Sequence, residues 1–189
     1  MNKTKDLLER YREDVSFLAE KHIDFEFDNS SPKHGAIVLA NILNTCNEVC
    51  IFDTDLSGDV AYQHADFLNA IEQFSLKPNK NLKIAIKNKQ VKDKLHIKIE
   101  ELNALNKNNI EIRKISNKSL DSICKYSKEN SSEKFNNVNF AVGDGRAFRI
   151  EFYNKKPEYK AKCNFNSLEK SKKLKDMFTN LYNQGETIT

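Results

Sequence analysis

Two acidic residues, Asp53 and Asp55, follow directly after the short apolar run Val49–Phe52. The carboxyl end of a buried strand is the place where α/β folds commonly put their sites. Carboxylates there can act as a nucleophile, as a general acid or base, or as ligands of Mg²⁺. The same residues can also simply cap the helix that follows the strand. Both interpretations are consistent with the residues alone.

The segment that contains Asp53 and Asp55 is similar to the first motif of haloacid-dehalogenase phosphatases. Asp144, which follows Gly143, resembles the metal-binding Asp of that family. The resemblance implies a Mg²⁺-dependent phosphohydrolase that uses Asp53 as nucleophile, Asp55 as general acid or base, and Asp144 near the metal. The match ends there, because residues 146–152 indicate a strand where the phosphatases begin a helix. We therefore favour capping acids and keep the phosphohydrolase as the alternative.

A second motif lies later in the chain, on a strand that enters a hairpin. Asn137, Asn139 and Asp144 have the spacing of the H-x-K-x₄-D motif, with Asn in place of both His and Lys. Asn164 and Phe165 match the end of a G-S-x-N-F segment, although they lie further from Asp144 than the usual six residues. On these motifs, the chain from residue 34 onward resembles a half-domain of the phospholipase D superfamily. It is most similar to small bacterial members that have lost the catalytic His and Lys.

Active members of that superfamily combine two such motifs, from two half-domains or from a homodimer, and one His attacks the phosphorus. Asn137 can neither form a phosphohistidine nor transfer a proton at neutral pH. Asn139 lacks the positive charge that would stabilise the transition state. The resemblance therefore implies a fold and a homodimer without phosphodiesterase activity and without a cofactor. Polyanion binding would use the basic residues near the hairpin, which are Arg146, Arg149 and Lys162.

His96 and Lys98 also fit the beginning of the H-x-K frame, but they lie in an amphipathic helical pattern. Residues two apart on a helix point about 200° away from each other, so these two cannot hold one phosphate. The four cysteines do not form the two short-spaced pairs of a zinc site, and we expect buried thiols in a cytoplasmic protein and no metal. They are Cys46, Cys50, Cys124 and Cys163.

The net charge of +4 conceals an uneven distribution along the 189 residues. Residues 1–76 hold 6 basic and 14 acidic side chains, whereas residues 77–128 hold 14 basic and 5 acidic ones. A basic middle segment is consistent with nucleic-acid contact, with attraction between the two segments, or with a protein partner. No apolar run is long enough for a membrane span, and residues 1–14 are too charged for a signal peptide.

The hydrophobic pattern predicts alternating helices and strands in one domain over residues 1–189. We expect a mainly parallel or mixed sheet with helices on both faces and a late antiparallel hairpin, as in a phospholipase D-like half-domain. The predicted helices cover residues 2–22, 33–46, 59–74, 91–105 and 119–126, with a last one from about 167 to 182. The predicted strands cover residues 23–27, 49–52, 82–87, 110–115, 138–142 and 148–152, and residues 185–189 are expected to fray.

Three functions follow as hypotheses. The first is a non-catalytic phospholipase D-like binding module that contacts nucleic acid or another polyanion. The second is the Mg²⁺-dependent phosphohydrolase, and the third is a regulatory subunit that assembles with a protein partner through its uneven charge.

Overall fold

A computed structural model describes residues 3–54, 61–87, 94–105, 109–116, 120–130, 137–153 and 160–188. The helices are α1 (Lys3–Glu20), α2 (Pro32–Thr45), α3 (Ala65–Ser75), α4 (Lys94–Ala104), α5 (Asp121–Asn130) and α6 (Leu168–Tyr182). The strands are β1 (Phe27–Asn29), β2 (Glu48–Asp53), β3 (Asn81–Ile86), β4 (Ile110–Lys114), β5 (Asn137–Gly143), β6 (Ala147–Tyr153), β7 (Ala161–Asn164) and β8 (Glu186–Thr187).

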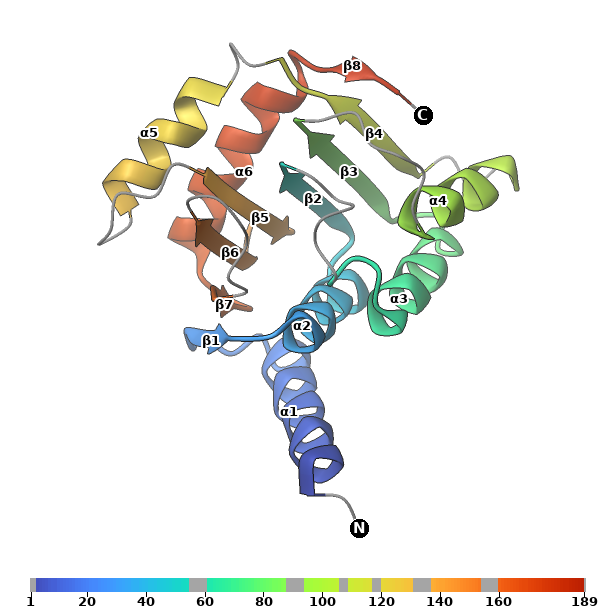
Figure 1. Cartoon of the computed structure of the whole chain (residues 1–189), viewed down its shortest axis with the longest axis vertical. Coiled ribbons are helices and arrows are strands. Elements are labelled where there is room, and N and C mark those ends of the chain that lie inside the picture. Colours follow the sequence, from blue (N-terminus) through green and yellow to red (C-terminus); the bar gives the residue numbers. More distant parts are fainter. Residues whose placement is uncertain are drawn as a thin grey trace.

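The strands form one eight-stranded sheet in the order β1-β7-β6-β5-β2-β3-β4-β8 (Figure 1). Pairing is parallel between β2 and β3 and between β3 and β4. The other pairs are antiparallel, including β2 with β5 and the hairpin of β5 with β6. The mixed α/β fold that the sequence predicts is confirmed, with parallel pairing confined to three neighbouring strands.

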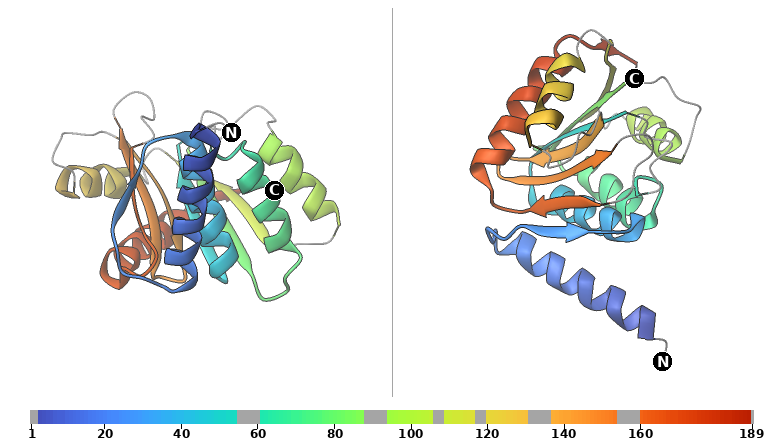
Figure 2. Two further views of the ribbon diagram at one scale, coloured as in Figure 1. Left: turned by 90° about the horizontal axis from the view of Figure 1, so that it is seen from below. Right: turned by 60° about the vertical axis from the view of Figure 1, so that its left-hand side comes forward.

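Each face of the sheet is covered by its own helices, because the side chains of a strand alternate between the two faces. On one face, the core contains apolar residues of α1, α2, α3 and α4 together with Val49 and Ile51 of β2. On the other face, α5 and α6 pack against Cys50 and Phe52 of the same strand. Figure 2 shows the two groups of helices on opposite sides of the strands. The sheet is therefore the middle layer of three.

The strands differ from the sequence prediction at three places, and each difference comes from a contact that is distant in sequence. Residues 23–26 are not in a strand, and β1 begins only at Phe27, where it pairs with β7. The strand β7 itself was not expected, since its four residues have no clear apolar pattern. The prediction that residues 185–189 fray is also wrong in part, because Glu186 and Thr187 pair with β4.

Helix α5 continues to Asn130, whereas the hydrophobic pattern predicts a helix that ends at residue 126. Helix α1 packs on α2 through the buried residues Val15 and Ala19 and projects away from the sheet (Figures 1 and 2). None of the helices within the described ranges is both long and apolar enough to pass through a membrane.

Candidate functional site

A cluster of buried polar residues lies at the sheet edge where β2 and β6 end and β5 begins. Its members are Asp53 on β2, Asn139 on β5, and Arg149, Glu151 and Tyr153 on β6. All five side chains lie on the sheet face covered by α2, because they alternate with residues of the opposite core. The register pairs Asn139 directly with Glu151. This cluster is the polar centre of the α2 face.

Asn139 is a hydrogen-bond acceptor inside the protein. Its side chain is only 1% exposed. The Oδ1 atom accepts hydrogen bonds from the backbone N–H of Thr54 at 3.1 Å and from the Thr54 hydroxyl at 3.2 Å. The hydroxyl of Tyr153 donates a third bond at 3.2 Å. Asn139 therefore joins the ends of β2 and β6 and carries no charge.

Arg149 and Glu151 form a buried ion pair, in which Nη2 donates to Oε2 at 3.2 Å. The Nε atom of Arg149 also donates to the Oδ1 atom of Asn29 at 3.2 Å, which links β6 to β1. A Cβ atom added at Gly35 would lie 3.2 Å from Arg149 Nη2. The glycine thus lets the first turn of α2 lie close to the guanidinium. A buried ion pair stabilises a protein only when its geometry is good, because burial removes the hydration of both charges.

The neutral groups in the cluster and beside it keep their protons. Burial raises the pKa of Tyr153 above its ordinary value, and the negative charges of Asp53 and Glu151 raise it further. Burial likewise raises the pKa of Cys163 to about 12. The Cys163 thiol donates to Asn29 at 3.2 Å. At neutral pH neither the phenol nor the thiol is an activated nucleophile.

Asp144, the last residue of the motif, lies at the opposite end of the strands. Its carboxylate accepts hydrogen bonds from the backbone N–H groups of Asn47, at 3.0 Å, and Glu48, at 2.8 Å, where β2 begins. Asp144 follows Asn139 by five positions, with four strand residues between them, and five extended steps span about 16 Å. The backbone of Asp144 has φ 50°, a left-handed conformation that Asp and Asn tolerate better than most residues. Here Asp144 holds the turn of the hairpin.

Asn164 also lies away from Asn139, since its register partner is Phe148. Its side-chain amide donates to the carboxylate of Asp24 at 2.8 Å, and its oxygen accepts from the backbone N–H of Asn166. The backbone of Asn137 belongs to β5, and its side chain lies outside the described part of the structure. Of the four residues proposed for a vestigial site, the structure therefore does not bring Asp144 or Asn164 to Asn139.

The residues proposed for polyanion binding all have partners within the chain. Arg149 is buried in its ion pair with Glu151. Arg146 donates to the carbonyl oxygens of Phe165 at 2.9 Å and of Thr45 at 2.8 Å, the last residue of α2. Lys162 forms an exposed ion pair with Glu26 at 2.9 Å. Arg149 is buried, because the sheet and α2 enclose its side chain.

The alternative phosphatase residues are separated in the same way. Asp53 is buried at the end of β2, whereas Asp144 binds the backbone at its beginning. Asp55 lies outside the described residues. Within the described ranges, no group of three or more His, Cys, Asp or Glu side chains is arranged to hold a metal ion.

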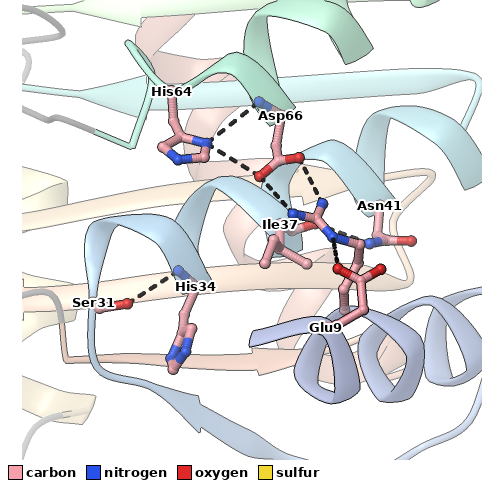
Figure 3. A network of polar contacts seen from close by, with 8 residues as sticks. Glu9, Ser31, His34, Ile37, Asn41, His64 and Asp66 are labelled. Atoms are coloured by element: carbon pink, nitrogen blue, oxygen red, sulfur yellow. Dashed lines mark hydrogen bonds and ion pairs between the residues drawn. The ribbon is translucent and has the colours of Figure 1, made fainter. Parts of the chain in front are cut away.

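A second polar network joins helices α1 and α3 (Figure 3). The guanidinium of Arg12 binds both carboxylate oxygens of Asp66, with a shortest distance of 2.6 Å. His64 lies 3.1 Å from the same carboxylate. Beside Arg12 is a surface groove of about 320 Å³, lined mainly by amide and small side chains of α1, α2 and α3. This network fastens α1 to the body of the domain.

Glu151 and Tyr153 were not among the candidate residues, although the sequence contains a signal for them. Arg149, Glu151 and Tyr153 alternate with Phe148, Ile150 and Phe152, so the three polar side chains share one face. Following this alternation along β6 would have found the cluster.

Comparisons with known proteins give the class of fold. No protein-family model matches the chain, and no curated protein matches its sequence. Among solved structures, it is similar to Nuc from Salmonella typhimurium, a phospholipase D family member, with a TM-score of 0.55 and 13% identity. The match covers 88% of this chain and 99% of that chain. The chain therefore has a phospholipase D-like fold.

Proposed function

We propose that this protein is a non-catalytic domain of phospholipase D-like fold that acts by binding a partner. The observation that supports this proposal is the state of Asn139. It stands where the family has a lysine, it is buried, and its oxygen already accepts three hydrogen bonds from the chain. A side chain fixed in this way cannot neutralise the charge of a phosphorane.

The charge of the cluster supports the same proposal. Asp53 and Glu151 are both buried there, and Arg149 already pairs with Glu151. Phosphodiester cleavage needs positive charge at the reacting phosphate. A phosphate brought to this edge would instead meet the carboxylate of Asp53. In this proposal, Asn139 within the frame of the motif serves to join strands.

The experiment is a hydrolysis assay with bis(p-nitrophenyl) phosphate and with single-stranded DNA, in the presence and absence of EDTA. A non-catalytic domain gives the rate of the buffer blank with both substrates. Turnover that co-purifies with the protein through two chromatography steps and scales with its concentration would overturn the proposal.

The exposed lysines favour a polyanion as the partner. Within the basic segment 77–128, the lysine side chains that are exposed include two on the same face of α5, Lys125 and Lys128. Affinity for single-stranded DNA or RNA should fall steeply between about 50 and 200 mM salt, because phosphate contacts release counterions. The double substitution Lys125→Glu/Lys128→Glu should weaken binding. The control Lys21→Glu/Lys33→Glu changes the net charge equally and should not.

Equal losses in both double variants would mean that net charge alone attracts the nucleic acid. No binding at low salt would exclude a polyanion as the partner. A protein would then be the remaining candidate for the partner of the binding module.

A further inference from the structure

The groove of about 320 Å³ beside Arg12 is built from matching stripes of residues on two helices. Its lining runs from Ile37 to Asn44 on α2 and from Asp66 to Gln73 on α3. On both helices the lining residues have the spacing i, i+3, i+4 and i+7, which is one face of a helix over about 10 Å. Helix α1 supplies the remaining wall. The groove is therefore a continuous surface that three helices form together.

The charges at one end of the groove cancel each other. The guanidinium of Arg12 donates to both oxygens of the Asp66 carboxylate, at 2.6 and 3.3 Å, and this pair joins α1 to α3 (Figure 3). Of the described residues that line the groove, only these two carry a charge. An ionic ligand would have to break the pair to reach an opposite charge. The groove therefore favours a neutral ligand.

The other polar groups of the groove are mainly carboxamides that the protein does not use for itself. Asn44, Asn69 and Gln73 are exposed, and their side chains form no hydrogen bond with any described residue. Asn41 is only 8% exposed, and its Nδ2 atom donates to the carbonyl oxygen of Ile37 at 3.0 Å. This bond fixes the side chain of Asn41 and leaves its Oδ1 atom to accept another. Four carboxamides thus line a groove about 10 Å long.

A molecule with several neighbouring hydroxyl groups complements this lining. A carboxamide has an acceptor beside two donors, and a hydroxyl both donates and accepts, so two adjacent hydroxyls can bind one carboxamide. The small side chains of Ala40 and Ala70 leave room for the C–H face of a ring. None of the lining residues that the structure describes is aromatic, so a nucleobase would find no stacking partner. The volume corresponds to roughly ten molecules of liquid water, enough for one or two sugar rings.

We propose that this groove binds an uncharged sugar or a similar polyol, with the carboxamides of Asn44, Asn69 and Gln73 as its hydrogen-bond partners. The groove lies on the sheet face opposite to α5, so this site is separate from the lysines of the proposed polyanion surface and does not depend on them. Each hydrogen bond to the ligand replaces a hydrogen bond to water. We therefore expect weak binding, with a dissociation constant of about 1–10 mM.

Two-dimensional ¹H–¹⁵N NMR tests the proposal, because the side-chain amides of Asn and Gln give their own signals. The probes are D-glucose, D-ribose, N-acetyl-D-glucosamine, myo-inositol and maltose, each titrated to about 100 mM. At least one of them should shift the side-chain signals of Asn44, Asn69 and Gln73 until they saturate. The signal of Asn180, which is exposed on α6 across the sheet, should stay in place.

Variants then test whether the carboxamides hold the ligand. Asn69→Ala and Gln73→Ala should each weaken the binding of the best probe at least about threefold, and the double variant at least about tenfold. Both positions are exposed, so the variants keep the fold. Asn180→Ala removes an exposed carboxamide outside the groove and is the matched control, which should leave the affinity unchanged.

Two further probes distinguish a polyol from other ligands. Glucose 6-phosphate should bind no more tightly than glucose, because Arg12 is already paired, and the uncharged peptide N-acetyl-alanyl-alanine amide should bind less tightly than the best sugar. Tighter binding of the phosphate or of the peptide would overturn the proposal. So would the absence of saturable shifts at the groove with all five sugars, or binding that the double variant retains in full.

Discussion

The side-chain oxygen of Asn139 accepts hydrogen bonds from both the backbone N–H and the hydroxyl of Thr54, at 3.1 and 3.2 Å. This relationship ties the first residues of β5 to the chain just beyond β2. Asn139 thus supplies a hydrogen-bond acceptor for the protein itself, and we expect its substitution to change the stability of the fold.

Asn139→Ala removes one acceptor and leaves the donors of Thr54 and Tyr153 without it. We expect the free energy of unfolding to fall by about 1–3 kcal/mol, the usual cost of leaving buried polar groups unsatisfied. Urea denaturation followed by circular dichroism measures this change. The exposed Asn69 offers the control Asn69→Ala, which should change stability by less than about 0.5 kcal/mol. Equal effects of the two substitutions would show that the network around Asn139 contributes nothing.

Asp144 should matter for folding through two separable features, its carboxylate and its left-handed backbone. Asp144→Ala loses the bonds to Asn47 and Glu48 and also strains the backbone at φ 50°. Asp144→Gly loses the bonds only, because glycine adopts this conformation freely. We expect both variants to melt below the wild type, with the Ala variant lower than the Gly variant. Asp176→Ala, at an exposed site on α6, is the control; a reversed order would contradict the role of the turn.

The Arg149–Glu151 pair predicts a strong asymmetry between single and double substitutions. Arg149→Met leaves the Glu151 carboxylate buried without its partner and should cost about 3–5 kcal/mol of stability. The double variant Arg149→Met/Glu151→Leu removes both charges and should recover most of that loss. The exposed pair Lys173–Glu169 provides the comparison, since breaking it should cost less than about 1 kcal/mol. Additive losses in the double variant would refute the coupling.

Glu26 gives the protein a specific response to acid. Burial acts to raise the pKa of Glu26, but the hydrogen bonds from Lys170 and Lys162 outweigh it and hold the pKa below its ordinary value of 4.5. Between those two values the unfolded chain binds more protons, so the stabilisation is present above pH 4.5 and is lost as the pH falls through the folded-state value. Since the pair is partly exposed, the loss should stay below about 1 kcal/mol.

The measurement is the melting temperature between pH 7 and pH 3. Glu26→Gln should flatten the acid side of this curve relative to the wild type. Glu20→Gln, on the exposed side of α1, should leave the shape unchanged. An identical acid limb in wild type and Glu26→Gln would exclude Glu26 as a contributor.

The strands of the centre of the sheet could be predicted from the sequence, because they bury both faces. Val49–Phe52 and the apolar residues of β5 and β6 give continuous or alternating patterns that need no distant partner. The strand β7 could not be predicted in this way. Its four residues form a strand only because β6 and β1 lie on either side of it.

For a related reason, the sequence singles out Asn139 but not its partners. Asn139 could be chosen as a candidate because it falls in the frame of the H-x-K-x₄-D motif. The position of Asp144 could not be predicted, because its partners Asn47 and Glu48 lie almost 100 residues earlier in the chain. The spacing of a motif indicates which residues follow one another along a strand. It does not indicate which distant residues lie beside each end of that strand.

The most direct test of a phospholipase D-like domain without phosphodiester chemistry compares three proteins in one assay. Wild type, Asn139→Ala and Asp53→Asn are incubated with two substrates in turn. The first is bis(p-nitrophenyl) phosphate. The second is p-nitrophenyl phosphate in the presence of Mg²⁺, which tests the alternative phosphatase. For a non-catalytic domain, all three proteins give the rate of the buffer blank with both substrates. Turnover by the wild type that either substitution abolishes, in a variant that remains folded, would contradict the central claim.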